Sequence, residues 1–378
     1  MKTPAPSISD PAAPGNAPRP VGTGLRGWPA LRRLLAFFAL LVCALWLTDA
    51  AINAGLRRIR TSGFGVSNRI LAGQVNAEVL ITGSSRAVTH YDPRVLEART
   101  GRRVFNIGIN GSQTDMQLAR LKAYLRHNPK PALIIHNLDL FSFQVTHGGV
   151  YDPGQYLPYL REPALYQALE RIDPAIRKAR WLPLYGYAVQ DLRLTWLVGI
   201  RGLLGWNPTE DHVQGFTPRR QEWTGDFERF RASNPEGLRV AVEPEGVAVM
   251  DELVRLCRDQ DIPLVLVYSP EYAEMQQMTA NRAEVFDRFR ALQRDHGVPL
   301  LDFSDSTICA ARTNFYNSQH LNDRGAAAFS GELADRMLQD AVIASYLRPA
   351  PPARLSGSPA APDRSGHASV MESGGTRR

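Results

Sequence analysis

Five short apolar runs, separated by segments with helical periodicity, constrain the fold of this chain more than any other feature. The runs span residues 78–83, 103–106, 132–138, 262–268 and 298–303, and further helices are expected over 246–259, 281–294 and 323–337. Strands that are apolar along their whole length and alternate with helices are typical of a parallel sheet covered on both faces. The sequence therefore predicts an α/β fold with three α/β/α layers.

One long segment, residues 141–241, interrupts this alternation inside an α/β domain expected over 76–347. The segment contains four of the six tryptophans: Trp181, Trp196, Trp206 and Trp223. We expect a helical, aromatic-rich cap. Its aromatic side chains either form a small core of the cap itself or belong to a lid, where they stack on a sugar ring or pack an acyl chain. Its apolar stretch Leu192–Leu204 is expected to be a buried helix rather than a helix lying on a membrane.

The N-terminal region contains an unbroken apolar run from Leu34 to Leu47, which continues to Leu56 with Asp49 as the only charge. A run of this length is long enough to cross a bilayer. Because the preceding segment is long and the residues around Ala50 make a poor cleavage site, we expect an uncleaved single-pass anchor over residues 31–56. A signal peptide cleaved near Ala50 is the alternative. The expected location is the inner membrane, with the large domain on the periplasmic side.

The basic character of the chain is confined to its two ends. Residues 1–33 and 348–378 together account for the whole formal charge of +7, and the chain between them is neutral. This distribution argues against a nucleic-acid partner, because it provides no basic groove on the folded domain. Residues 1–30 and 348–378 are rich in proline and small residues, and we expect both tails to be disordered.

The three cysteines, Cys43, Cys257 and Cys309, have no spacing typical of a zinc site. Cys257 and Cys309 are expected as two buried thiols, with a disulfide between them as the alternative. We expect no metal and no dissociable cofactor.

Three polar segments follow strands or precede the last helix, and in a doubly wound sheet they meet at the carboxyl edge. They are Gly83-Ser84-Ser85, Asn106-Ile107-Gly108-Ile109-Asn110-Gly111 and Asn317-Ser318-Gln319-His320. A serine that attacks an acyl group needs a base, commonly a histidine, and its oxyanion needs N–H donors that glycine loops can supply. The set therefore indicates acyl transfer; the alternative is that Ser84 or Ser85 only caps the next helix.

These motifs resemble those of the SGNH (GDSL-type) hydrolase superfamily over residues 76–140 and 245–340. The resemblance implies a flavodoxin-like sheet, Ser85 as the nucleophile with its own N–H as an oxyanion donor, and Gly111 as a second donor. It also implies His320 as the base, with Asn317 at the position of the acid. The anchor and the His-Leu-Asn-x-x-Gly sequence that starts at His320 look like the membrane-tethered members, which esterify or de-esterify cell-surface polymers.

Two positions depart from the family pattern. Asn317 stands where the family has an aspartate, and an amide cannot stabilise an imidazolium by charge. Asp139 stands at the position of an oxyanion-donating asparagine, where an ionised carboxylate repels the oxyanion. Asn137 is the alternative donor, and Asp302 or Asp305 is an alternative support for His320.

Some polar residues near these motifs have simpler interpretations. Arg86 follows the serines and is expected either to bind a substrate anion or to form a structural ion pair. His136 alternates with apolar neighbours, so we expect a packed core residue. His90 and His147 follow the first and third strands and are expected on surface loops, with a place near the site as the alternative.

The sequence therefore predicts a membrane-anchored serine ester hydrolase or O-acyltransferase that acts on an envelope or secreted polysaccharide. The alternative is a catalytically degenerate relative that binds glycan or scaffolds a polysaccharide-assembly complex. An acyl ester or carbohydrate polymer is the expected substrate or ligand, and the membrane is the partner of the N-terminal helix.

Overall fold

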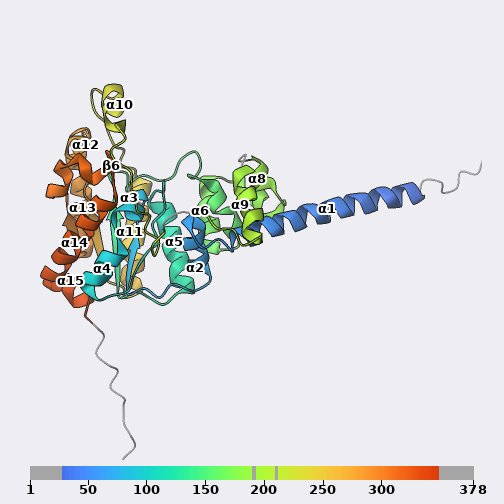
Figure 1. Cartoon of the computed structure of the whole chain (residues 1–378), viewed down its shortest axis with the longest axis horizontal. Helices are drawn as coiled ribbons and strands as arrows, with labels where there is room; N and C mark the ends of the chain where they lie inside the picture. Colours follow the sequence, from blue (N-terminus) through green and yellow to red (C-terminus); the bar gives the residue numbers. More distant parts are fainter. Residues whose placement is uncertain (1–27, 190–192, 209–211, 349–378) are drawn as a thin grey trace, which may run out of the picture.

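The computed structural model describes residues 28–189, 193–208 and 212–348. Most of the two terminal tails, which the sequence predicts to be disordered, lies outside the described residues. The described chain forms an α/β domain from which one long helix, α1 (Trp28–Leu56), projects (Figure 1).

The central sheet has five parallel strands in the order β2-β1-β3-β4-β5, as the fold prediction requires. The strands are β1 (Val79–Thr82), β2 (Val104–Asn106), β3 (Leu133–Leu138), β4 (Leu264–Tyr268) and β5 (Leu300–Asp302). All five lie within the apolar runs predicted as strands. The order reverses at β1, which pairs with β2 on one side and with β3 on the other. Ligand sites of such sheets lie at this reversal, beyond the carboxyl ends of the strands.

Helices cover both faces of the sheet. One apolar cluster contains side chains of α2 (Ser62–Leu71), α5 (Thr114–His127), α11 (Pro244–Asp259) and α13 (Arg282–His296). The cluster on the other face contains side chains of α3 (Ser85–His90), α4 (Pro93–Thr100), α14 (Asp323–Gln339) and α15 (Ala341–Tyr346). Alternate strand residues belong to alternate clusters; Leu80, for example, joins the first cluster and Ile81 the second. The sheet is therefore buried on both faces.

The remaining elements lie outside these layers. Helices α6 (Pro163–Ile172), α7 (Ile176–Trp181), α8 (Tyr185–Val189) and α9 (Arg193–Leu203) lie beside the base of α1 (Figure 1), and α10 (Asp226–Ser233) follows them in the chain. The last short elements are α12 (Ala273–Gln277) and the hairpin β6 (Phe315–Asn317) and β7 (His320–Leu321).

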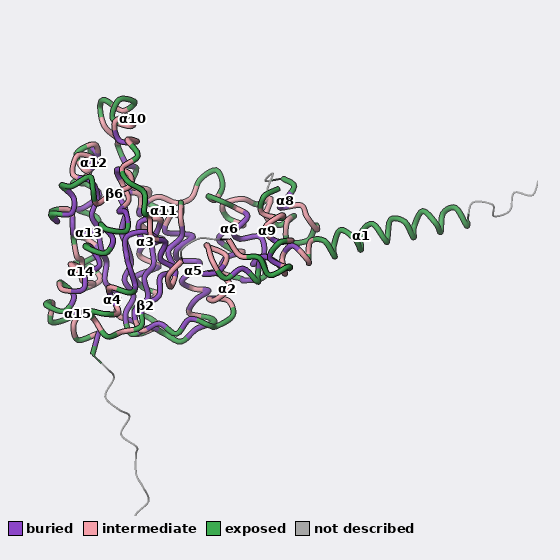
Figure 2. The backbone as a smooth tube through the Cα atoms, in the orientation of Figure 1, coloured by how far each residue is buried: buried purple, intermediate pink, exposed green. Residues whose placement is uncertain are grey.

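Helix α1 is long and apolar enough to cross a membrane. Most of its length is exposed, in contrast to the buried strands and the packed helices of the domain (Figure 2). Only its last turns are buried, where Ile52 and Leu56 join an apolar cluster with Tyr156, Tyr159 and Tyr187. A long apolar helix near the N-terminus is found both in membrane anchors and in signal sequences.

Helix α9 corrects one expectation. The sequence predicts that Leu192–Leu204 is a buried helix, but only Gly199 and Gly202 of α9 are buried. Leu194 is 78% exposed. The two glycines are buried because α9 packs directly against the backbone of α1, while Val198 and Ile200 are only partly buried against the cluster that contains Ile52 and Leu56.

Cys257 and Cys309 are buried free thiols, as expected. Cys257 belongs to the first apolar cluster, whereas Cys309 follows Ile308 of the cluster on the other face, and neither thiol forms the alternative disulfide. Burial raises the pKa of the Cys257 thiol to about 12, so this cysteine behaves as a small apolar side chain.

His136 lies in β3 and is completely buried, as the sequence predicts. Neither ring nitrogen has a hydrogen-bond partner among the described residues. Burial lowers the pKa of the imidazole to about 4 from an ordinary value of 6.5. The ring is therefore neutral in the folded protein at pH 5, where it is protonated in the unfolded chain.

We expect that His136→Leu makes the protein less sensitive to acid. A folded-state pKa below the unfolded value means that stability is lost as the pH falls from 6.5 toward 4, by about 2 kcal/mol for this one group between pH 7 and pH 5. Urea unfolding at both pH values measures the effect. The variant should lose about 2 kcal/mol less than the wild type, and an equal loss in both proteins would contradict the prediction.

Candidate active site

The chain turns sharply at the end of β1. Gly83 has a φ of +143°, and a Cβ at this position would lie 2.8 Å from the Cβ of Asn137 on β3. Only glycine meets both conditions without strain. Ser84 then caps helix α3 by accepting a hydrogen bond from the N–H of Arg86, and Ser85 is the first residue of that helix. The two serines therefore divide the roles, because Ser84 takes the capping role and leaves the Ser85 hydroxyl free for another partner.

That partner is His320. The Ser85 Oγ lies 2.7 Å from His320 Nε2, although the two residues are 235 positions apart in the chain. The hairpin β6–β7 supplies the histidine, and its register pairs Asn317 with His320. This hairpin is absent from the sequence prediction, because its two strands are too short to produce a periodic signal.

The contacts of Asn317 define the protonation of the histidine ring. Its Oδ1 accepts the backbone N–H of Gln319 and of His320, at 3.1 and 2.9 Å, so the atom facing them is the oxygen. The same oxygen lies 2.9 Å from His320 Nδ1, which must therefore carry the proton. Nε2 is left with a lone pair directed at the Ser85 hydroxyl. This is the tautomer that a general base needs.

Electrostatics favour the neutral form of the histidine. Burial, followed by the positive charges of Arg86 and Arg219, lowers the pKa of His320 to about 3. Tyr316 stacks on the ring, with centroids 5.5 Å apart. The ring is consequently an unprotonated acceptor over the whole physiological range. The same charges oppose the imidazolium that forms when the ring takes a proton, and the neutral Asn317 provides no compensation.

A cavity of about 180 Å³ brings the three predicted segments together. Ser85, Gly111 and His320 all line it, together with Arg86 and Asp139. Gly111 has a φ of +61°, and a Cβ there would lie 2.5 Å from the ring of Tyr151. Glycine is therefore required both for the backbone conformation and for the close approach of that tyrosine.

Arg86 and Asp139 form a buried ion pair in the wall of the cavity, with Nε and Oδ1 3.6 Å apart. The Arg86 guanidinium also donates to the carbonyl of Ser269 and lies over the ring of Tyr268, 4.5 Å from its centroid. Burial raises the pKa of Asp139, and Arg86 opposes that increase. Arg86 thus forms a structural ion pair, one of the two roles expected from the sequence, and it also lines the cavity.

Asn137 does not line this cavity. It is fully buried, its Oδ1 accepts the hydroxyl of Tyr91 at 2.8 Å, and its amide donates to Leu138 O and Asp139 Oδ1. Residue 137 lies on the opposite face of β3 from its neighbours 136 and 138, and its polar atoms are engaged in the core. The structure therefore gives it no place as an oxyanion donor.

Asp302 and Asp305 are both exposed and do not support His320. Asp302 instead accepts the N–H of Ser304 at 2.9 Å. His147 is exposed as expected and lies 3.0 Å from Glu243.

His90 was expected on a surface loop, which is wrong; the alternative, a place near the site, holds for this residue. The residue is fully buried at the end of α3, where its Nε2 accepts the N–H of Leu321 at 3.1 Å. Its Nδ1 must then donate to Ser269 Oγ, 2.9 Å away. His90 therefore ties α3, which carries Ser85, to the hairpin that carries His320. No local sequence signal marks this role, since all the contacts are long-range.

No family model matches the sequence, and no curated protein matches it. Solved structures do show similarity. One is a protein named as an acylhydrolase from Bacteroides fragilis, 11% identical with a TM-score of 0.34, over 71% of this chain and 88% of that one. Another is named as a lipolytic protein of the G-D-S-L family from Desulfitobacterium hafniense. It is 14% identical with a TM-score of 0.33, over 69% of this chain and 99% of that one. An acetyl xylan esterase from Butyrivibrio proteoclasticus is 9% identical with a TM-score of 0.29, over 69% of this chain and 63% of that one.

We expect that Asn317→Asp increases the reactivity of Ser85. A carboxylate can accept the same N–H groups while its charge stabilises the imidazolium and raises the pKa of His320. The reverse change in a serine protease costs about four orders of magnitude in rate because the histidine takes the wrong tautomer. Asn317 already holds the productive tautomer, so only the charge effect is gained, and an increase of about tenfold in kcat/KM for a small acetate ester is expected.

The pH profile provides the control for this substitution. The base is active only when unprotonated, so activity is lost as the pH falls through the pKa of His320. The wild type should keep its kcat/KM down to pH 5, whereas the Asn317→Asp profile should begin to fall at a higher pH. A variant that is no faster than the wild type, with an unchanged profile, would contradict the assignment of His320 as the base.

Proposed function

We propose that this chain is a serine ester hydrolase or O-acyltransferase with Ser85 as the nucleophile and His320 as the general base. The observation that carries the proposal is the 2.7 Å contact between Ser85 Oγ and His320 Nε2, in the tautomer that leaves Nε2 free to accept a proton. A serine paired in this way, in a cavity with glycine-bearing loops, has the parts needed for nucleophilic acyl transfer.

In the proposed mechanism, Ser85 Oγ attacks the ester carbonyl while its proton moves to His320 Nε2. The carbonyl oxygen becomes an oxyanion that the N–H groups of Ser85 and Gly111 stabilise, and the nearby Arg86 contributes positive charge. The C–O bond to the leaving alkoxide then breaks, and His320 returns the proton to that oxygen. Water or a sugar hydroxyl next attacks the acyl-serine by the same steps, giving hydrolysis or transfer respectively.

We further propose that α1 is retained as an inner-membrane anchor and that the substrate is an acylated envelope or secreted polysaccharide. The length and exposure of α1 support the anchor. Tyr151 supports a sugar ligand, because its side chain is 63% exposed and lies directly against Gly111 at the cavity. An exposed aromatic ring beside a reactive serine is a suitable surface for stacking on a sugar ring.

A fluorophosphonate probe tests the reactive serine in the full-length protein, solubilised in a neutral detergent. We expect mass spectrometry to locate the label on Ser85 and to find none in Ser85→Ala or His320→Ala. Ser112→Ala is the matched control, since Ser112 lines the same cavity but donates its hydroxyl to the carbonyl of Ile109 at 2.8 Å. This control should label like the wild type.

Absence of labelling in the folded wild-type protein would overturn the enzyme proposal. It would favour the degenerate alternative, a protein that binds glycan or scaffolds an assembly complex. Two observations are compatible with that alternative: the uncharged Asn317 behind His320, and the carboxylate of Asp139 in the cavity wall.

The stacking role of Tyr151 predicts a separation between polymeric and small substrates. Tyr151→Ala should raise KM for an acetylated oligosaccharide about tenfold, in line with a loss of roughly 1.4 kcal/mol, and should leave hydrolysis of a small acetate ester within about twofold. Tyr151→Phe keeps the ring and should behave as the wild type in both assays. Equal effects of the alanine variant on both substrates would rule out a role confined to sugar binding.

A further inference from the structure

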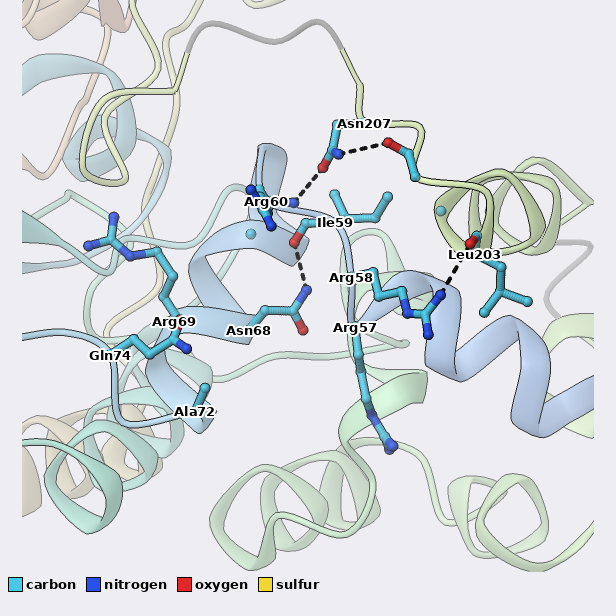
Figure 3. A pocket seen from close by; sticks show the side chains of 13 residues that line it. Arg57, Arg58, Ile59, Arg60, Asn68, Arg69, Ala72, Gln74, Leu203 and Asn207 are labelled. Atoms are coloured by element: carbon cyan, nitrogen blue, oxygen red, sulfur yellow. Dashed lines mark hydrogen bonds between the residues drawn. The ribbon is translucent and has the colours of Figure 1, made fainter.

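A second and larger cavity, of about 820 Å³, lies away from Ser85 at the base of α1. Three parts of the chain form it: the link between α1 and α2, helix α2 itself, and the end of α9 with the turn that follows (Figure 3). None of the residues proposed for catalysis lines this cavity. It is therefore a separate feature that the proposed acyl-transfer chemistry leaves unexplained.

The cavity has a strongly positive lining. Four arginines, Arg57, Arg58, Arg60 and Arg69, contribute to it, and no aspartate or glutamate among the described residues does (Figure 3). Within the described part of the chain, none of the four forms an ion pair.

Among the described residues, these arginines contact carbonyl groups and an aromatic ring and no carboxylate. Arg57 donates to the carbonyl of Pro158 and Arg58 to the carbonyl of Leu203, each at 3.1 Å. Arg69 lies over the ring of Phe105, 4.5 Å from its centroid. Four arginines around one cavity give it a positive potential, which favours the binding of an anion.

The position of the cavity follows from the packing of α9 on α1. Gly199 contacts Ile52, and Gly202 contacts Gly55 and Ile59. The contact points advance together along both helices, so the two helices run in the same direction. The backbones approach so closely that a Cβ on Gly55 would lie 1.7 Å from the carbonyl oxygen of Gly199. The cavity lies just beyond this contact, where α1 has ended.

The length of the apolar segment places this point at the surface of a bilayer. Residues 34–56 form about 34 Å of helix, which matches a hydrocarbon core of about 30 Å. The polar residues in its last part are covered by protein, since Asp49 accepts the N–H of Leu184 and Asn53 accepts the hydroxyl of Tyr187. The arginines that follow Leu56 then emerge at the level of the lipid headgroups.

Exposed apolar side chains beside α1 support the same placement. Trp181 is 68% exposed, and Leu182, Val189, Leu194 and Trp196 are also exposed. Trp181 ends α7 and Leu182 follows it, Val189 belongs to α8, and the other two belong to α9. These helices lie around the base of α1 (Figure 1). Tryptophan is enriched where proteins meet the membrane–water interface.

We propose that this arginine-lined cavity binds the phosphate of an anionic lipid headgroup. Arginine matches phosphate oxygens with two parallel N–H donors, and a membrane surface presents phosphate at high local concentration. The volume is larger than one phosphate requires, which leaves room for the rest of a headgroup. The lipid source rests on the proposed retention of α1, whereas binding of phosphate as such does not.

Native mass spectrometry of the full-length protein in a neutral detergent tests this proposal. The probes are phosphatidylglycerol, phosphatidylcholine and inorganic pyrophosphate, and the intact mass shows at the same time whether α1 is retained. We expect phosphatidylglycerol to bind in preference to phosphatidylcholine, and Arg58→Gln/Arg60→Gln to weaken its binding at least tenfold. If pyrophosphate binds but phosphatidylglycerol does not, and Arg58→Gln/Arg60→Gln weakens pyrophosphate binding at least tenfold, the cavity is a phosphate site for a soluble ligand.

The matched control is Arg255→Gln/Arg288→Gln, which removes two exposed arginines from α11 and α13, away from the anchor. It should bind phosphatidylglycerol like the wild type, and Arg58→Lys/Arg60→Lys, which keeps the charge, should fold and bind with intermediate strength. Equal binding by all variants, or no preference for phosphatidylglycerol or pyrophosphate over phosphatidylcholine, would overturn the proposal. Fluorophosphonate labelling of Ser85 in the same variants separates this result from the fate of the proposed enzyme activity.

Discussion

The close approach of β1 and β3 at Gly83 is the constraint on which the candidate site depends. Because a Cβ at this position would collide with Asn137, the chain can leave β1 directly above its neighbouring strand only through a glycine. The turn places Ser85 at the start of α3, over the point where the strand order reverses. Every other contact of the site, including the hairpin that carries His320, is arranged around the serine hydroxyl held there.

Arg86 connects the electrostatics of the site to its geometry. Its guanidinium pairs with Asp139, donates to Ser269 and packs on Tyr268, so it cannot move away from the cavity. Burial is the largest cause that lowers the pKa of His90 and of His320, and the charge of Arg86 is the second. Both imidazoles are therefore neutral: His90 serves as a fixed link between α3 and β7, and His320 as an acceptor for Ser85. A buried cation that keeps the base unprotonated also opposes its protonation during a reaction, and this opposition is stronger with an amide at position 317.

The parts of this structure that local sequence patterns determine were predictable, and those that depend on distant contacts were not. The five strands begin with apolar residues, and Asp92, Pro93 and Gly101 mark the ends of α4 as their residue types require. By contrast, α3 is too short to show a period, and the burial of His90 depends on Ser269 and Leu321. The side of β3 on which Asn137 lies follows from the strand register, so a shift of one residue decides whether a side chain reaches the cavity or the core.

The exposed aromatic residues of the segment 141–241 lie on two different surfaces. Trp181 and Trp196 lie exposed on the helices that pack around α1, whereas Tyr151 lies against Gly111 at the edge of the Ser85 cavity. The helices α6–α9 therefore contribute less to the candidate site than to the junction between the domain and α1. Because α9 contacts α1 through backbone at Gly55, Gly199 and Gly202, this junction has little freedom to bend. The close packing of α9 on α1 therefore places the last turns of α1 within the folded domain and leaves the rest of the helix outside it.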